Sequence, residues 1–321
     1  MNTPKNPFVT IVTPAYNQAS YLPQAIESVL KQDYPHIEYI VLDDGSTDGT
    51  RDVLKAYTGR LRWETQPNLG QAHTLNKGWR LGKGLFLGYL SADDILAPQA
   101  ISEAVHLLQS SNDVVMVYPN CNLIDHSSRV IRRGVAREFD YASLVIDQEC
   151  YVGPGALFRR SVFEATGGWR PELVLAPDRE FWMRVGLLGR CFMIPRILAS
   201  YRVHPDTISF RKANAHIASE YVRVAEEYFS LPDVPPDLLA KKNLALSRAY
   251  LVEARIHLRA GRPRSALKSF RHARQLDPNL STLDVLIKVG RALASRPYHR
   301  IWWWLRGVSV AAPYRTSNRP Q

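Results

Sequence analysis

Hydrophobic and polar residues along the first sixty positions form alternating blocks that predict strands and helices. β-Branched and aromatic residues fill 8–16 (FVTIVTPAY), which predicts a buried strand. Apolar residues recur at helical spacing in 20–32 (SYLPQAIESVLKQ), and Ser20 is the predicted helix cap. A second apolar strand, 37–46 (IEYIVLDDGS), ends in two carboxylates, and a helix follows it in 46–58.

The same alternation continues to residue 94. A short strand is predicted in 60–67 (RLRWETQP), a helix in 72–82 (AHTLNKGWRLG) and a further strand in 84–94 (GLFLGYLSADD). The resulting βαβαβαβ order with continuous apolar strands predicts an α/β protein. Its sheet should be mostly parallel and sandwiched by helices.

Two pairs of adjacent carboxylates, Asp43–Asp44 and Asp93–Asp94, stand at the carboxyl ends of predicted strands. Like charges at an apolar strand end repel each other and lose hydration, so each pair is costly without a partner. One alternative is a turn in which Asp93 or Asp94 caps a helix beginning near Pro98. Two independent pairs favour a site instead, because parallel sheets bind ligands at this edge.

Carboxylates at several strand ends suit a hard divalent cation, Mg²⁺ or Mn²⁺, that is shared with substrate phosphates. The motifs GxGxxG and GxxxxGK[ST] are absent from the sequence, which argues against dinucleotide binding and P-loop chemistry. A nucleotide diphosphate is therefore the expected ligand, and the cation would neutralise the diphosphate as it leaves.

The second half of the chain is less regular until residue 238. A helix in 98–110 and a strand in 114–120 precede an irregular region, and a further helix is predicted in 178–189. Residues 247–279 form two amphipathic segments that resemble one tetratricopeptide repeat. A single copy cannot bury its own apolar face, so we expect a helical hairpin that packs on the main domain; partner binding is the alternative. The matching positions are Tyr250, Ala254, Gly261, Ala266, Phe270, Ala273 and Pro278.

The first fifty residues also resemble a known family. VTIVTPAYNQASYLPQAIESVLKQDYPHIEYIVLDDGSTDGT (9–50) is similar to the opening of family 2 glycosyltransferases, which have the GT-A fold. NLGQAHTLNKG (68–78) and YLSADDILAP (89–98) resemble its next two motifs, and the resemblance covers about residues 7–210. Weaker similarities lie at 155–169, 177–186 and 201–209. The resemblance implies a GT-A nucleotide-diphospho-sugar transferase fold and sugar transfer to a hydroxyl group.

The resemblance also implies roles in donor binding. Asp44 would accept a hydrogen bond from the nucleotide base, Asp43 would support the same loop, and Asp93 would face the ribose. Tyr16 would lie against the base. The residues implied to line the nucleotide site are Pro14, Ala15, Tyr16 and Asn17.

Metal binding and catalysis are implied in the same way. Asp94 would bind the metal, and His204 is placed like a residue that completes the metal or diphosphate site. Asp178 stands where the family has its general base. The alternative for Asp178 is that it caps a helix. The alternative for His204 is an ordinary surface or core position. The family usually has Glu before the base, whereas this chain has Pro177, and Leu75 replaces an Arg found in many relatives.

Charge is unevenly distributed along the chain. Residues 1–240 contain 24 Lys and Arg against 27 Asp and Glu, whereas residues 241–321 contain 17 against 3, so the net charge of +11 arises at the end. The Pro- and Asp-rich stretch before residue 241 suggests a linker. The predicted organisation is a GT-A domain at 1–230, a linker at 231–240, a helical hairpin at 241–285 and a basic Trp-rich tail at 286–321.

The basic tail combines Trp302–Trp304 with several Lys and Arg residues. This composition suits an interfacial segment on an anionic membrane. A helix that packs its Trp residues on the hairpin is an alternative. A nucleic-acid surface would also use basic and aromatic side chains, but no recognisable nucleic-acid motif accompanies the tail, so we expect no nucleic-acid partner. Membrane contact would favour a lipid-linked or envelope-glycan acceptor.

Cysteine use and hydropathy indicate the compartment. Cys121, Cys150 and Cys191 show no metal-like spacing and predict free thiols in a reducing environment. The sequence shows no apolar leader and no run of eighteen apolar residues. We therefore expect a cytoplasmic protein that can lie on the inner face of the plasma membrane.

The sequence as a whole predicts an inverting, metal-dependent glycosyltransferase. It lacks the QxxRW motif of processive members, which predicts single additions. A nucleotidyltransferase remains an alternative, because it also uses a metal and strand-end carboxylates. A catalytically inactive scaffold for protein partners is the other alternative, and Pro177 is the feature that keeps it open.

Overall fold

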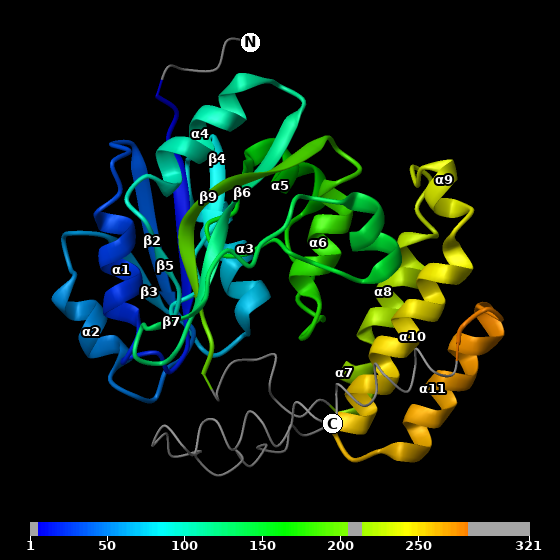
Figure 1. The fold of residues 1–321 in the computed structure, drawn as a ribbon. Coiled ribbons are helices and arrows are strands. Elements are labelled where there is room, and N and C mark those ends of the chain that lie inside the picture. The colour runs from blue at the N-terminus through cyan, green and yellow to red at the C-terminus, as the bar shows by residue number, and fades with distance from the viewer. Residues whose placement is uncertain (1–5, 205–213, 282–321) are drawn as a thin grey trace.

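The computed structural model describes residues 6–204 and 214–281 (Figure 1). The predicted tail at 286–321 lies outside the described residues, as does most of the motif that follows His204. The strands are β1 (Val9–Ala15), β2 (Ile37–Asp43), β3 (Arg62–Thr65), β4 (Phe86–Tyr89), β5 (Ile95–Leu96), β6 (Val114–Ile124), β7 (Val130–Arg132), β8 (Leu157–Arg159) and β9 (Arg190–Arg202).

Helices connect these strands and follow the last of them. They are α1 (Leu22–Leu30), α2 (Thr50–Ala56), α3 (Gln71–Leu81), α4 (Ala100–Ser110), the π-helix η1 (Ser143–Asp147), α5 (Arg160–Thr166), α6 (Pro177–Val185), α7 (Ala215–Ala218), α8 (Glu220–Tyr228), α9 (Pro236–Leu239), α10 (Lys242–Arg259) and α11 (Pro263–Leu276). The predicted cap of the first helix is wrong, because α1 begins at Leu22 after Tyr21 and Ser20 is exposed.

The predicted βαβ order builds one half of the sheet. Strands β3, β2, β1 and β4 lie side by side and all run parallel. Their register pairs Ala15 with Asp43 and Asp43 with Thr65, so β1, β2 and β3 end at one edge. The carboxylates that follow these strands therefore meet there, as expected for a parallel sheet.

The other half of the sheet is mixed. Strand β8 is antiparallel to both β4 and β6, β6 is parallel to β9, and β5 is antiparallel to β9. The α/β class is confirmed, and the expectation of a mostly parallel sheet applies to the first four strands. The short β8 changes the direction of pairing because it occupies the position between β4 and β6.

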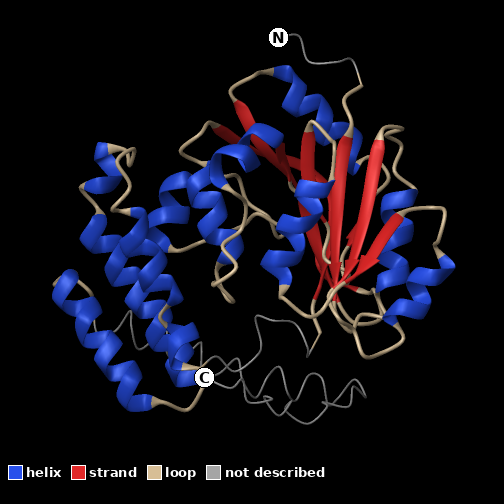
Figure 2. Cartoon of the chain, turned by 180° about the vertical axis from the view of Figure 1, so that it is seen from behind, coloured by secondary structure: helices blue, strands red, loops and turns tan. Residues whose placement is uncertain are grey.

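Helices cover both faces of the sheet (Figure 2). Leu22, Ile26 and Val29 of α1 pack with Ile11 of β1 in one buried cluster, to which α4 also contributes. On the other face, Val12 packs with Trp79 of α3 in a second cluster. Alternate residues of β1 thus face opposite layers, as the period of a strand requires.

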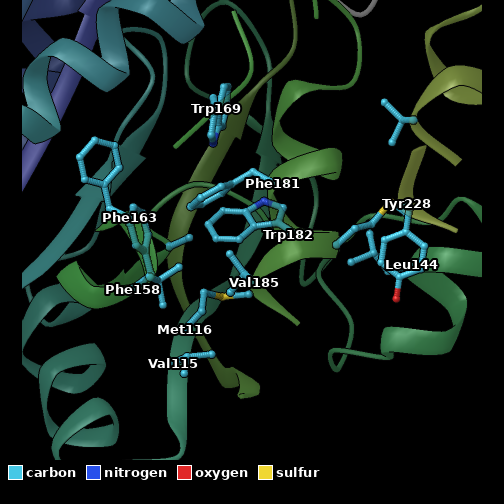
Figure 3. Packing of buried hydrophobic residues seen from close by; sticks show 14 of the residues in the cluster. Val115, Met116, Leu144, Phe158, Phe163, Trp169, Phe181, Trp182, Val185 and Tyr228 are labelled. Carbon is cyan, nitrogen blue, oxygen red and sulfur yellow. The ribbon is translucent and has the colours of Figure 1, made fainter. Parts of the chain in front are cut away.

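The second cluster is rich in aromatic rings and extends into the C-terminal helices. Phe181 and Trp182 of α6 lie against Phe158 of β8, with ring centroids 5.2 and 6.0 Å from that of Phe158 (Figure 3). Tyr228 of α8 belongs to the same cluster, and its hydroxyl lies 2.7 Å from that of Tyr141. Helices α8, α9 and α10 therefore contribute to the core of the sheet domain.

The predicted helical hairpin is present as α10 and α11. The Ser247 hydroxyl donates to the carbonyl of Ala273 at 2.8 Å, and Ala254, Ala266 and Ala273 are buried in these two helices. Small side chains of this kind allow two helices to approach closely. In the part of the chain that the structure describes, no helix is both long and apolar enough to cross a membrane.

The segment 231–240, which the sequence suggests as a linker, contains α9. Val234 and Leu238 are buried in the same cluster as Trp182. Apolar side chains within a Pro- and Asp-rich stretch thus fasten it to the sheet domain.

Candidate functional site

The ends of β1 and β2 form one hydrogen-bonded edge. The backbone amide of Asp44 donates to the carbonyl of Ala15 at 2.8 Å. Asn17 has a φ of +54°, a conformation that Asn tolerates better than most residues, and its side-chain oxygen accepts from the Thr47 amide at 2.8 Å. Pro14 and Tyr16 are half-buried at this edge. Pro14–Asn17 and the loop after β2 are therefore held as a unit.

Asp43 is fully buried and bonded to the protein on both carboxylate oxygens. It accepts from the Ser46 amide at 3.0 Å, from the Thr65 hydroxyl at 2.7 Å and from the Arg51 guanidinium at 2.9 Å. Burial by itself would raise the pKa of Asp43, but these hydrogen bonds outweigh it and hold the pKa below its usual value. These contacts indicate that Asp43 stabilises the conformation of the loop after β2.

Asp44 fastens the same edge to the start of α3. One of its oxygens accepts from the Gln66 amide group at 2.8 Å and the Leu69 amide at 2.9 Å, and the other accepts from the Gly70 amide at 2.8 Å. Gly45, which follows it, has a φ of +78°, and a Cβ there would lie 2.8 Å from the Asn68 nitrogen. Glycine is thus required for the approach of these two loops.

The turn after β4 carries the second pair of carboxylates. Asp93 Oδ2 lies 2.9 Å from Nε2 of the buried His204, and one oxygen of Asp94 accepts from the Arg202 amide at 2.9 Å. Helix α4 begins after Gln99 without a side-chain cap, so neither aspartate plays the capping role that the alternative gave it. The structure brings Asp93, Asp94 and His204 together.

Burial raises the pKa of Asp94 well above its usual value, and the neighbouring Asp93 raises it further, whereas Arg202 opposes the shift. The second oxygen of Asp94 accepts no hydrogen bond from any described residue. A buried carboxylate with an unused oxygen beside another carboxylate fits a divalent cation, which would compensate both charges.

Arg202, the last residue of β9, was not predicted as part of the site. It is fully buried, and its guanidinium donates to the carbonyl of Asp93 at 2.8 Å, the carbonyl of Asp125 at 2.9 Å and the Gln24 side chain at 2.8 Å. It also lies over the Tyr21 ring at 4.8 Å. Its only signal in sequence was its place in the weakly matching stretch 201–209.

Asp178 lies in the first turn of α6, directly after Pro177. Proline suits this position because the first helical amide has no partner within the helix. Asp178 is half-buried, and burial raises its pKa against the opposing effect of nearby backbone amides. The N-cap is Ala176, with no side-chain cap, so Asp178 is not the capping residue.

The charges of Asp178 and Asp94 both act on Tyr89, the buried last residue of β4. Burial raises the pKa of Tyr89 far above its usual value, and the charges of Asp178 and Asp94 raise it further. Tyr89 is packed edge-to-face against Trp169, with ring centroids 5.2 Å apart. The two carboxylates thus act on one hydroxyl, although residues 94 and 178 come from separate parts of the chain.

Asn76 of α3 fixes the position of Trp169. The Asn76 side-chain nitrogen donates to the Trp169 carbonyl at 2.6 Å, and the Trp169 amide donates to the Asn76 side-chain oxygen at 2.9 Å. Gly168 has a φ of +87°, and a Cβ there would lie 2.2 Å from the Asn76 oxygen. The Gly-Gly-Trp turn is therefore built for this contact.

A pocket of about 300 Å³ lies beside the irregular region between β7 and β8. Its lining combines aromatic and charged side chains, and the Arg137 guanidinium lies over the Tyr151 ring at 4.7 Å. Neighbouring Cys150 has a pKa raised to about 12 by burial and, to a smaller extent, by Asp178. Lining residues include Tyr118, Arg137, Phe139, Ser143, Glu149 and Tyr151.

Residues 6–204 and 214–281 contain no ready-made metal site. No three His, Cys, Asp or Glu side chains there are already grouped for coordination. Asp93, Asp94 and His204 are the residues that fit a cation, and ligands from a bound diphosphate would have to complete such a site. The three cysteines are free thiols, as predicted.

Residues 10–167 match the family model described as Glycosyl transferase family 2. An uncharacterized glycosyltransferase of Rickettsia prowazekii (strain Madrid E) is 28% identical over 206 residues, which cover 62% of this chain and 65% of the relative. Chondroitin synthase of Escherichia coli is 26% identical over 223 residues, which cover 68% of this chain and 32% of the synthase. The matches thus span less than two thirds of each relative's length.

Two solved structures resemble the fold. TarS 1-349 of S. aureus in complex with UDP-GlcNAc has a TM-score of 0.57 at 16% identity, and the likeness covers 84% of this chain and 92% of TarS. A mannosyltransferase of Pyrobaculum calidifontis in complex with GDP-Man and Mn²⁺ has a TM-score of 0.59 at 22% identity. That likeness covers 94% of this chain and 84% of the mannosyltransferase. These similarities confirm the predicted GT-A fold.

Proposed function

Through its N-terminal domain the chain belongs to glycosyltransferase family 2, and from that membership we propose that it transfers a sugar from a nucleotide-diphosphate sugar to an acceptor hydroxyl with inversion. The observation that carries the proposal is the turn after β4, where the buried Asp94 keeps one oxygen unused beside the Asp93–His204 pair. The charges of Asp178 and Asp94 both raise the pKa of the Tyr89 hydroxyl. One carboxylate is placed to hold the donor through a cation, and the other is placed to take a proton.

The nucleotide is assigned to the edge formed by Pro14–Asn17 and the loop after β2. Tyr16 lies against the base, Asp44 accepts a hydrogen bond from it, and Asp93 faces the ribose. Asp43 keeps the loop in shape through its three hydrogen bonds. The nucleotide sugars in the two similar structures, UDP-GlcNAc and GDP-Man, support a donor of this class.

The cation, Mg²⁺ or Mn²⁺, is assigned to Asp94 and His204, with Asp93 bonded to the histidine. A carboxylate that orients a ligating histidine is common around metal sites. When bound, the cation supplies Lewis-acid stabilisation to the departing diphosphate. The Mn²⁺ in the similar mannosyltransferase supports this assignment.

Asp178 is assigned as the general base. The acceptor hydroxyl gives its proton to the Asp178 carboxylate, its oxygen bonds to the anomeric carbon, and the bond from that carbon to the diphosphate breaks. A single displacement of this kind inverts the anomeric centre. A raised pKa suits the role, because a base is most effective when its pKa approaches the working pH.

The acceptor is assigned to the pocket lined by Tyr118, Arg137 and Tyr151. Aromatic faces and polar groups together are what a sugar ring requires. The similarity to a chondroitin synthase supports a glycan of the cell envelope or surface, or its lipid-linked precursor, as the acceptor. We assign single additions, because QxxRW is absent from the sequence.

Contact with an anionic membrane surface is part of the proposal. The outer face of α11 carries exposed Arg264, Lys268, Arg271 and Arg274, and none of them forms an ion pair with another described residue. Basic side chains near an anionic leaflet each contribute about 1 kcal/mol of attraction. This face supports the assignment of a cytoplasmic protein at the inner side of the plasma membrane.

The test is an assay of nucleoside diphosphate release from a panel of UDP- and GDP-sugars with Mn²⁺. The wild type should release diphosphate with one or more donors, and Asp178→Asn and Asp94→Asn should not. Pyrophosphate release from a nucleoside triphosphate and a sugar phosphate would instead indicate a nucleotidyltransferase. Equal, zero turnover by all three proteins across the panel would favour an inactive scaffold.

A further inference from the structure

Glu220, the first residue of α8, is buried and accepts hydrogen bonds from three consecutive backbone amides. One oxygen accepts from Val174 at 2.9 Å, and the other accepts from Leu175 at 2.7 Å and Ala176 at 3.3 Å. These amides immediately precede α6. A carboxylate from a different helix thus takes the place of a side-chain cap at the start of α6, which has none of its own.

The next residue of α8, Tyr221, contacts Arg179, which directly follows Asp178. The guanidinium of Arg179 lies over the Tyr221 ring at 5.3 Å, and it donates to the carbonyl of Leu144 at 3.1 Å. Arg179 is 1% exposed, so its side chain is fixed between α8 and η1. Asp178 therefore lies between two points, 174–176 and Arg179, that are both held by α8.

The chemistry of Glu220 makes this a firm attachment. Hydrogen bonds from backbone amides to an ionised carboxylate are roughly twice as strong as those between neutral groups. Glu220 forms no ion pair with another described residue, so its buried charge depends on these amides and on the positive end of α6. Loss of that charge would release the backbone two residues before Asp178.

We propose that Glu220 is a positioning residue that orients Asp178 for proton transfer, so that the helices after β9 form part of the catalytic apparatus. The proposal rests on the proposed function, in which Asp178 is the general base. Displacement of a catalytic group by about 1 Å can reduce turnover by about 10²-fold. Donor binding depends on the other side of the site, at β1 and β2, and should not change.

The test compares Glu220→Gln with the wild type in the full chain. We expect kcat to fall by about 10- to 100-fold, the KM for the donor to stay within twofold, and the acid limb of the kcat–pH profile to shift. Glu226→Gln is the matched control, because Glu226 is exposed on the same helix; it should leave all three quantities unchanged. A folded Glu220→Gln protein with wild-type kcat and pH profile would overturn the proposal.

A second variant and a double mutant separate the remaining outcomes. If Glu220→Gln does not fold, Arg179→Lys removes the stacking on Tyr221 and should lower kcat in the same way; wild-type kcat there would also overturn the proposal. Wild-type turnover by Asp178→Asn would refute the proposed base itself. If Asp178→Asn is impaired, adding Glu220→Gln should cause no further loss of kcat, because the two residues act through one step.

Discussion

Replacement of Arg202 by methionine should destabilise the edge of the sheet that carries Asp93 and Asp94. Methionine keeps most of the side-chain volume but removes the buried guanidinium. Its hydrogen bonds to the Asp93 carbonyl, the Asp125 carbonyl and the Gln24 side chain measure 2.8, 2.9 and 2.8 Å. All three acceptors lose a charged donor at once.

The magnitude follows from these contacts. A hydrogen bond to a charged group contributes about 1.5–3 kcal/mol, but bonds that share one side chain do not add independently. The guanidinium also offsets the negative charges of Asp93, Asp94 and Asp125. Removal of one member of a buried charged network typically costs about 3–5 kcal/mol, because the remaining charges lose their partner. We therefore expect the free energy of unfolding to fall by about 3–5 kcal/mol for Arg202→Met.

Urea denaturation monitored by tryptophan fluorescence measures this change. Arg129→Met is the matched control, since the Arg129 side chain is 63% exposed and also bonds to Asp125. The Arg129 guanidinium lies largely in solvent, and the buried Asp125 keeps its hydrogen bonds from the Ser127 and Arg129 amides, so the loss should be about 1 kcal/mol or less. A loss below about 1 kcal/mol for Arg202→Met, equal to that of the control, would refute the reasoning that Arg202 organises this edge.

The other predictions concern catalysis, acidity and packing. Asp178→Asn should lower kcat by about 10²–10⁴-fold with donor affinity retained, as measured by steady-state kinetics and calorimetry; a smaller loss would contradict its role as a base. The base acts when deprotonated, so kcat should fall with decreasing pH through a pKa above the usual 3.8, and an acid limb at or below 3.8 would be contrary to the burial of Asp178. Asp43 has a lowered pKa in the folded protein, so its stabilising contribution is complete above 3.8 and disappears as the pH falls through the lowered pKa. In acid-unfolding scans, Asp43→Asn should flatten the fall of stability below pH 3.8, and an unchanged stability–pH profile would contradict a stabilising role of the Asp43 carboxylate. Trp79→Ala should cost about 3–5 kcal/mol in the same urea assay, because the ring is fully buried among aromatic partners; under 2 kcal/mol would mean that this cluster repacks.

Local patterns predicted the first half of the fold well. Strands β1, β2 and β4 and helix α1 were expected from runs of apolar residues at their characteristic spacing. Strand β9 was not predicted, because Pro195 and Arg196 interrupt its apolar residues. The position of β8 between β4 and β6 was also outside the reach of sequence patterns, since pairing depends on distant segments.

Site residues that belong to a sequence motif could be predicted, whereas residues that join the site through contacts with distant segments could not. Asp93, Asp94 and His204 were named from their motifs, and the structure brings them together. Arg202 bonds to Gln24, which is 178 positions away, and Glu220 bonds to amides 44 to 46 positions away. No local signal identifies such partners, because an isolated Arg or Glu at a helix or strand end is ordinarily exposed to solvent.

Helix capping shows the same limit. Ser20 has the chemistry of an N-cap, yet α1 begins after Tyr21. Pro177 stood out in sequence as a departure from the family pattern, whereas the structure gives it an ordinary role at the start of α6. Cap chemistry recognised in the sequence therefore does not by itself fix where a helix begins.

The most direct measurement is the anomalous scattering of Mn²⁺ in crystals of the protein grown with Mn²⁺ and a nucleoside diphosphate. We predict one peak within about 2.5 Å of an Asp94 carboxylate oxygen, in contact with the diphosphate, and nucleotide density along Pro14–Asn17. A bound nucleotide whose Mn²⁺ lies away from Asp94, or nucleotide bound at another edge of the sheet, would contradict a cation-held donor at this site.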